Sequence, residues 1–313
     1  MRNIRLTIEY DGTAYHGWQS QENAVAIQDV VNAAVNRLTG EECTLYGSSR
    51  TDAGVHAYGQ VVNFRTASGI PADKFAFALN TMLPGDVSVV RSEEAEPGFH
   101  ARFSARGKKY RYMFCNSMFP SAIMRNRAWH TYYPLDVEAM RRAAENLVGT
   151  HDFLAFSASG SSVKTTVRTI FSISVNGSGS GFPSAALPSA KSQTKPEGSS
   201  VIVQSPDATG PEPSYIERDA SSSCISSGPS LPATPVAPSA YHVAPGYAGI
   251  ISLDIEGDGF LYNMVRIIAG TLVEVGYGKI MPGDIPGILE SRDRRRAGIT
   301  APPQGLYLME VYY

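Results

Sequence analysis

The residues best suited to chemistry lie in segment 47–57, which reads Gly-Ser-Ser-Arg-Thr-Asp-Ala-Gly-Val-His-Ala. It holds one carboxylate, Asp52, with an arginine two positions before it and small residues around it. Small residues let a substrate backbone or base come close, and Arg50 could hold the acid ionised or grip a phosphate. On local chemistry alone, a polar turn with a capping aspartate is the simpler interpretation.

Cations and aromatic residues alternate in a second candidate region, although the net charge of the chain is −2. That overall charge argues against an RNA partner, but clustered cations can follow a phosphate backbone even in a neutral protein. The clusters are Arg102, Arg106, Lys108, Lys109 and Arg111, and later Arg292, Arg294, Arg295 and Arg296. Tyr110 and Tyr112 lie within the first cluster, and aromatic rings among cations suit unstacked bases. Solvated surface charge is the alternative for each cluster.

The cysteines and histidines predict no metal site. Cys43, Cys115 and Cys224 are odd in number and far apart, which favours isolated thiols over a disulfide framework or a zinc site. The six histidines show no metal-ligand spacing either.

Five blocks of the sequence together resemble the TruA family of tRNA pseudouridine synthases. The segment Arg-Thr-Asp-Ala-Gly-Val-His-Ala at 50–57 resembles the active-site motif of that family. The other blocks are 4–19, before this motif, and 99–112, 260–266 and 297–308, after it, and all five occur in the order of the family. About 173 to 249 falls outside the resemblance. One departure is Ser49, where many members have glycine.

The resemblance implies a role for four residues. Asp52 is the catalytic acid, and Arg266 pairs with it. Tyr110 stacks on the target base, and Arg50 helps to displace the target nucleotide and holds RNA. Without the resemblance, a tyrosine on an alternating strand is typical of core packing, and Arg266 could equally be a solvent-exposed helix residue.

The implied reaction converts uridine to pseudouridine at tRNA positions 38 to 40 in the anticodon arm. It adds no atoms and changes no oxidation state, so we expect no cofactor. Asp52 could act as a nucleophile or as a base that starts an elimination at the sugar, and the sequence leaves both routes open. The uridine must be flipped out of its stack. Family members work as homodimers, so we expect a homodimer with tRNA as its partner.

The hydrophobic periodicity predicts an α+β fold with two ferredoxin-like (RRM-like) units. They join into an extended, mostly antiparallel sheet with a catalytic cleft. Residues 1–105 form an N-terminal domain with the Asp52 loop, and residues 106–313 a C-terminal domain. The predicted strands are 4–10, 43–48, 60–64, 87–92, 109–116, 167–175, 250–257 and 306–312. The predicted helices are 26–38, 72–82, 136–148, 264–275 and 284–291.

Residues 177–247 interrupt the C-terminal domain and are dominated by Ser, Pro, Gly and Ala. Such a composition cannot bury enough apolar surface to offset the entropy of ordering. We therefore predict a disordered insertion at the tip of a hairpin between strands 167–175 and 250–257.

Two other functional classes remain open. A non-catalytic RNA-binding module could use the same fold, although binding needs no buried acid. A hydrolase with paired carboxylates would need a second acid, and the three motifs at 50–57, 99–112 and 260–266 offer only Asp52. No apolar run approaches the ~20 residues that span a bilayer and no targeting segment is evident, so we expect a cytoplasmic protein without membrane contact.

Overall fold

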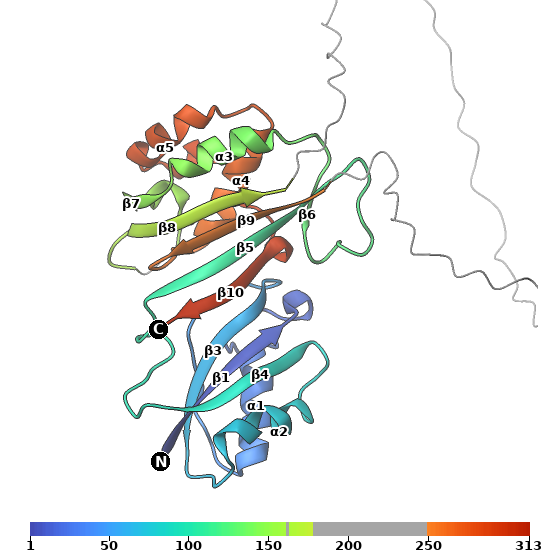
Figure 1. Ribbon diagram of the computed structural model, residues 1–313, viewed down its shortest axis with the longest axis vertical. Coiled ribbons are helices and arrows are strands. Elements are labelled where there is room, and N and C mark those ends of the chain that lie inside the picture. The colour runs from blue at the N-terminus through green and yellow to red at the C-terminus, as the bar shows by residue number, and fades with distance from the viewer. Residues whose placement is uncertain (161–162, 178–248) are drawn as a thin grey trace, which may run out of the picture. The chain divides into compact units, whose positions relative to one another are not determined.

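The computed structural model describes residues 1–160, 163–177 and 249–313, which all belong to one compact unit (Figure 1). The helices are α1 (Ile27–Thr39), α2 (Phe75–Asn80), α3 (Val137–Glu145), α4 (Met264–Gly276) and α5 (Ile285–Ser291). The strands are β1 (Arg2–Tyr10), β2 (Tyr46–Gly47), β3 (His56–Thr66), β4 (Val87–Ala95), β5 (Gly107–Asn116), β6 (Trp129–Thr131), β7 (Gly149–Asp152), β8 (Val167–Asn176), β9 (Ile250–Gly257) and β10 (Leu306–Tyr312).

The strands form one ten-stranded sheet in the order β4-β1-β3-β10-β5-β9-β8-β7, with β2 beside β3 and β6 beside β5. Neighbours pair antiparallel except for β10 with β3 and β5 with β6. The predicted α+β fold with a large, mostly antiparallel sheet is therefore confirmed.

The N-terminal half follows the predicted β-α-β-β-α-β order. Alternate side chains of β1, namely Ile4, Leu6 and Ile8, are fully buried, as the period-2 pattern predicts. Helix α1 begins where the Asp29 carboxylate accepts from the Ala26 backbone N–H at 3.1 Å. It ends at Gly40, whose φ of 70° suits a left-handed C-cap.

The C-terminal strand β10 joins the two halves of the sheet. It runs parallel to β3, with Tyr307 opposite His56, and antiparallel to β5, with Leu306 opposite Tyr112. The segment after the Asp52 loop and the segment carrying Tyr110 thus flank the same strand. The division into domains 1–105 and 106–313 stays a prediction.

Strands β8 and β9 form the predicted antiparallel hairpin, with Asn176 opposite Ser252. The predicted disordered insertion 177–247 lies outside the described residues from residue 178 onward. The predicted strand 43–48 is shorter than expected, since only 46–47 pair with β3. The short strands β6 and β7 were not predicted, because three or four residues give no measurable alternation.

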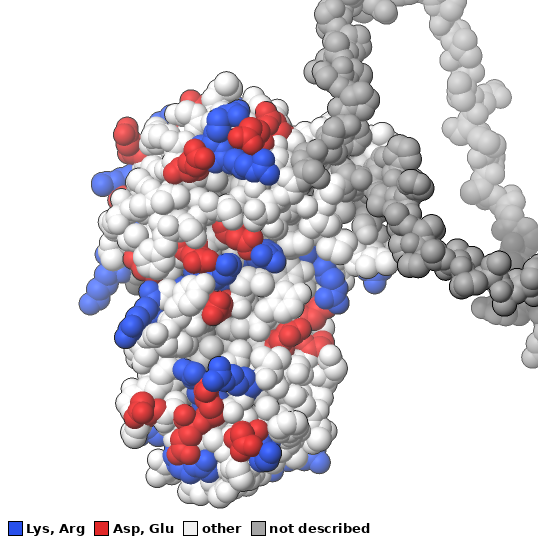
Figure 2. All heavy atoms as spheres, in the orientation of Figure 1, with Lys and Arg blue, Asp and Glu red and all other residues white. Residues whose placement is uncertain are grey.

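Helices cover one face of the sheet, and the other face carries mixed charges. Residues on that face form ion pairs between neighbouring strands: Arg5 with Glu93, Lys109 with Glu256, and Arg111 with Asp254. On the face in view in Figure 2, Lys and Arg side chains are interspersed with Asp and Glu. None of the described helices is both long and apolar enough to cross a membrane.

Candidate active site

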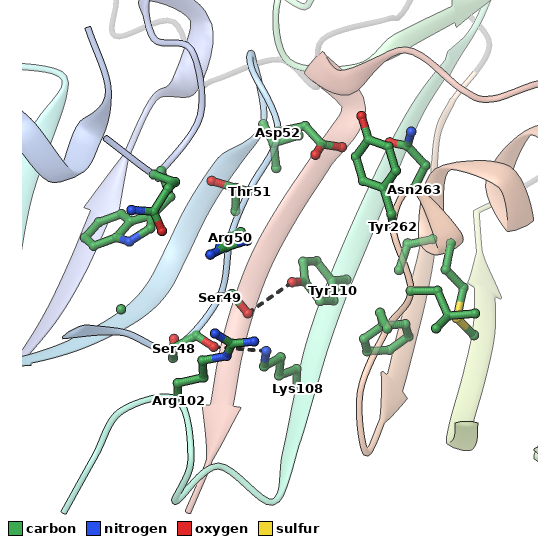
Figure 3. A pocket seen from close by; sticks show the side chains of 18 of the residues that line it. Ser48, Ser49, Arg50, Thr51, Asp52, Arg102, Lys108, Tyr110, Tyr262 and Asn263 are labelled. Carbon is green, nitrogen blue, oxygen red and sulfur yellow. Dashed lines mark hydrogen bonds between the residues drawn. The ribbon is translucent and has the colours of Figure 1, made fainter. Parts of the chain in front are cut away.

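Both halves of the sheet contribute to a cleft of about 740 Å³. Its walls are the segment 45–52 that leads from β2 into the Asp52 loop, the start of β5, the loop 100–103, and the segment 260–266 that enters α4. Figure 3 shows Asp52 and Tyr262 at one end of this cleft, with Tyr110 nearer the middle. A smaller hollow of about 520 Å³ adjoins that end and shares Arg50, Asp52 and Arg266 with it.

The loop that carries Asp52 is held by buried hydrogen bonds on both sides. The Trp18 backbone N–H donates to the Thr51 carbonyl at 3.1 Å, and the hydroxyls of Tyr10 and Thr51 lie 2.8 Å apart. On the other side, the fully buried Gln60 amide donates to the Ser49 carbonyl at 2.8 Å. The loop is therefore preorganised before any substrate binds.

Two glycines of the motifs permit this packing. Gly17 has a φ of +85°, and a Cβ there would overlap the carbonyl oxygen of Thr51. Gly54, two residues after Asp52, has a φ of +77°. Both conformations suit glycine, so the first block of the sequence, 4–19, serves to seat the Asp52 loop.

Arg266 connects Asp52 to the C-terminal signature. Its NH1 donates to Asp52 Oδ2 at 3.0 Å and to Asn263 Oδ1 at 2.8 Å. Its Nε donates to the Ala301 carbonyl at 2.7 Å. Asn263 adopts a left-handed conformation (φ 59°) at the start of α4, and Ala301 N–H donates back to the Arg266 carbonyl at 3.1 Å. The blocks 260–266 and 297–308 thus fix one guanidinium against one acid.

Asp52 keeps one carboxylate oxygen for a substrate. Arg266 contacts Oδ2, and no hydrogen bond to Oδ1 is present within the described part of the chain. About a third of the Asp52 side chain (32%) is exposed, against 15% for Arg266. Asp52 is the only acid among the described residues that line the cleft, so these residues offer no second carboxylate for glycosidase-type chemistry.

Tyr110 lines the cleft near its middle. It is 8% exposed and packs edge-to-face on Phe260, with ring centroids 5.1 Å apart. Its hydroxyl donates to Ser49 Oγ at 3.4 Å. Burial raises the pKa of Tyr110 to about 12, opposed by the Ser49 hydrogen bond and aided by the charge of Asp52. The phenol therefore stays neutral and presents a ring beside the acid.

The cation-rich segment 102–112 divides between two faces of the sheet, which corrects the interpretation of Tyr112 as a base-stacking residue. Tyr112 is fully buried, and its hydroxyl donates to the Pro302 carbonyl at 2.7 Å. Lys109 and Arg111 point to the opposite face, where they pair with acids. Of the five cations, Arg102 and Lys108 line the cleft.

The remaining candidates have simpler roles. Arg50 is exposed at the junction of the two hollows, where an incoming RNA could meet it. All four C-terminal arginines bind within the chain: Arg292 to Asp152, Arg295 to Asp293, and Arg294 and Arg296 to backbone carbonyls. His56 is 2% exposed, and its Nδ1 accepts from Gly12 N–H at 3.1 Å. Its Nε2 faces the carbonyls of Asn126 and Gln304, so His56 is a buried structural residue.

Sequence reasoning missed several residues of the site. Lys108 lay within the predicted cation cluster but was not distinguished from its neighbours. It lies two positions before Tyr110, so the alternation of a strand places both on one face. Asn263 and the Ala301 carbonyl carried no chemical signal, because their role depends on contacts with Arg266. The described residues contain no group of three or more His, Cys, Asp or Glu side chains arranged to hold a metal ion.

Comparison with known proteins identifies the family. The family model described as tRNA pseudouridine synthase matches residues 6–104 and 143–313. A tRNA pseudouridine synthase A of Acetivibrio thermocellus is 47% identical over the full length of both chains. Proteins with the same name from Ruminiclostridium cellulolyticum and Geotalea uraniireducens are 44% and 40% identical, again over the full length of both chains. This chain therefore belongs to the TruA family of tRNA pseudouridine synthases.

Proposed function

We propose that this enzyme isomerises uridine to pseudouridine at positions 38 to 40 of tRNA, with Asp52 as its catalytic acid. The observation that carries the proposal is the contact of 3.0 Å between Asp52 and Arg266, made inside a cleft that Tyr110 also lines. Four cations, Arg50, Arg102, Lys108 and Arg266, line this cleft with a single acid. Such a charge balance suits a polyanionic substrate in an otherwise slightly acidic protein.

The reaction needs one carboxylate and a base held out of its stack. The N1–C1′ bond of uridine breaks, the uracil turns, and a C5–C1′ bond forms. The hydrogen on C5 is lost and N1 gains one, so the product has the same atoms as the substrate. Oδ1 of Asp52 can attack C1′ or remove a sugar proton to start an elimination. Both routes use the same carboxylate in the same orientation.

The other site residues support this step. Arg266 orients the carboxylate through Oδ2 and is itself held by two further acceptors. Tyr110 offers a ring on which the flipped uracil stacks. Arg50, exposed at the mouth, takes the place that the target nucleotide leaves in the RNA or holds its phosphate. Because the reaction is an isomerisation, the proposal includes no cofactor and no metal.

The same fold could in principle serve as a non-catalytic RNA-binding module, and the site argues against this. A binding surface gains nothing from a carboxylate among phosphates, since like charges repel. Here Asn263, in a left-handed backbone conformation, and the largely buried Arg266 together hold Asp52 in the cleft. That arrangement is explained by catalysis.

We also infer a homodimer that binds tRNA across both subunits, a cytoplasmic location where tRNA is available, and domains at 1–105 and 106–313. The support for the dimer is that closed twofold dimers are the commonest oligomers and that the family resemblance implies one. Light scattering of the purified chain should give twice the mass of 33.7 kDa.

The test is Asp52→Asn, with Asp73→Asn as the matched control. Asparagine keeps the size and one acceptor oxygen for Arg266 but carries no charge. We expect Asp52→Asn to bind tRNA as the wild type does and to form no pseudouridine. Asp73 is an exposed acid outside the cleft, so its variant should retain full activity.

Mapping pseudouridine in tRNA from cells with and without the gene gives the positions. Substantial turnover by Asp52→Asn would refute the role of Asp52. Loss of a modification outside positions 38 to 40, with those positions intact, would refute the substrate assignment.

A further inference from the structure

Three aromatic rings line the cleft at the end where Lys108 lies. The ring centroids of Tyr46 and His100 are 4.9 Å apart, and those of His100 and Phe103 are 4.3 Å apart. Tyr46 is 43% exposed and Phe103 is 77% exposed. We call these three residues the aromatic platform. Large rings that stay exposed inside a cleft, when the chain could have buried them, are available to a ligand.

The loop that carries His100 and Phe103 is held by buried amides. Ala101 N–H donates to Asn63 Oδ1 at 2.8 Å, and Asn3 Nδ2 donates to the Phe99 carbonyl at 3.0 Å. Asn3 and Asn63 are 4% and 3% exposed. Buried polar side chains bonded to a loop backbone fix its conformation, so the loop is ordered before a ligand arrives and binding loses little entropy.

His100 holds the backbone that carries the Arg102 and Phe103 side chains. Its Nδ1 accepts from the backbone N–H groups of Arg102 at 3.1 Å and Phe103 at 3.4 Å. An Nδ1 that accepts in this way leaves Nε2 as the ring nitrogen that can donate. The guanidinium of Arg102 lies 5.7 Å from the centroid of the Phe103 ring. A cation thus lies over one ring of the platform.

A second cation completes this end of the cleft. Lys108 Nζ donates to the Ser48 carbonyl at 3.0 Å. Figure 3 shows Arg102 and Lys108 together beside Ser48, with Tyr110 between them and Asp52. Along β5, Lys108 and Tyr110 are two residues apart on one face, a rise of about 6.7 Å. The platform and its cations therefore occupy a separate position in the cleft, adjacent to the one proposed for the uracil.

We propose that the cleft holds two nucleotides at once. The target uridine lies at Asp52 and Tyr110, and the nucleotide adjacent to it in the tRNA stacks on the aromatic platform. The phosphate between them pairs with Arg102 and Lys108. This inference rests on the proposed function and deepens it, because it assigns residues that select an unstacked segment of RNA rather than a single flipped base.

The chemistry of the platform fits a nucleotide. Single-stranded RNA is held by aromatic rings that stack on bases and by cations that follow the backbone. The described lining of this end contains both and no carboxylate. A cleft of about 740 Å³ is also larger than one uracil ring requires. Stacking is tolerant of base identity, so the second position would accept any of the four bases.

The test compares Phe103→Ala with Phe77→Ala, using full-length protein and tRNA. The two phenylalanines are closely matched: Phe77 is 71% exposed and has Lys74 at 5.5 Å from its ring, but it lies on α2 outside the cleft. Loss of stacking on one base weakens binding by about 5- to 150-fold. We expect that increase in Kd for Phe103→Ala, none for Phe77→Ala, and a single-turnover rate at saturation that stays near the wild-type value.

A substrate with an abasic site beside the target gives a second measurement. An abasic neighbour should weaken tRNA binding to the wild type and have little further effect on Phe103→Ala, because the stacking partner is already absent. Equal weakening in both proteins would overturn the proposal, as would equal Kd values for the two alanine variants. Because Phe103 is mostly exposed, its loss should leave folding intact, and Phe103→Leu keeps apolar bulk if it does not.

The phosphate contact has a separate measure. Arg102→Gln should reduce the slope of log Kd against log salt by about 0.7 for one phosphate of a single strand, and the exposed Arg91→Gln on β4 should leave it unchanged. Identical slopes would remove the phosphate from the proposal. Wild-type tRNA conversion is measured in the same reactions. Absence of that conversion would refute the proposed function itself. Normal conversion together with an unchanged Kd for Phe103→Ala would refute only the proposal that a second nucleotide binds.

Discussion

Replacing Arg266 by methionine tests whether the ion pair with Asp52 acts in catalysis. Methionine keeps much of the apolar length and removes all three hydrogen bonds that Arg266 donates. The contact to Asp52 Oδ2 is 3.0 Å, which at an effective dielectric of about 20 corresponds to a Coulomb energy of about 5 kcal/mol. Water screens part of it, because the Asp52 side chain is 32% exposed. The measured range for hydrogen bonds to charged groups, about 1.5–3 kcal/mol, is therefore the better magnitude.

That energy converts to a rate. At 1.36 kcal/mol for each factor of ten, loss of the oriented carboxylate should lower kcat by about 10- to 150-fold. Stability should fall as well, since the Ala301 carbonyl and Asn263 Oδ1 lose their donor at about 1 kcal/mol each. For a domain of this size, that loss lowers Tm by about 4–8 °C.

Arg141→Met is the matched control for stability. Arg141 also makes three contacts, to Glu138 and to the carbonyls of Val175 and Gly177, but it lies on α3 outside the cleft. Its loss should lower Tm and leave kcat unchanged. Arg266→Lys keeps the charge but cannot reach Asp52 and Ala301 together, so it should fall between the wild type and Arg266→Met.

The assay follows tritium released from C5 of uridine in tRNA, because that hydrogen leaves when C5 bonds to C1′. Single-turnover conditions separate the chemical step from product release. A kcat for Arg266→Met within twofold of the wild type would refute the catalytic role of the pair. An equal loss of kcat in Arg141→Met would assign the effect to stability alone.

Two further predictions concern the loop and the cleft. Gly17→Ala should lower Tm and slow turnover, because the added Cβ overlaps the Thr51 carbonyl beside Asp52. Gly40→Ala is the control, since Gly40 has a similar φ of +70° but open space around it. It should cost only about 1 kcal/mol of stability and leave the rate unchanged. Burial, together with the charge of Arg102, lowers the pKa of Lys108 to about 8, so tRNA affinity should fall as pH rises through 8 and this fall should be smaller in Lys108→Met. The same shift means that the folded chain binds fewer protons than the unfolded chain between about pH 8 and pH 10.5. The contribution of Lys108 to stability should therefore rise with pH across that window. Denaturant titration of the wild type and of Lys108→Met measures this rise.

The sequence by itself determined most of the elements and the candidate for the catalytic acid. The period-2 pattern of β1, the helical spacing of α1 and the alternation of β8 and β9 are local, since they depend on neighbours a few residues apart. The ordered blocks supplied the family, and that resemblance pointed to Asp52 as the catalytic acid, since local chemistry alone favoured a polar turn with a capping aspartate.

The resemblance implied that Asp52 pairs with Arg266, but only the tertiary structure shows how the side chains are brought together. Asp52 and Arg266 are 214 residues apart in the chain, and their contact depends on β10 lying between β3 and β5, a pairing that no local pattern encodes. Lys108 and Lys109 are adjacent in sequence, yet one lines the cleft and the other pairs with Glu256 on the opposite face. Strand alternation separates them, but only the packing of helices on one face determines which of the two faces the cleft.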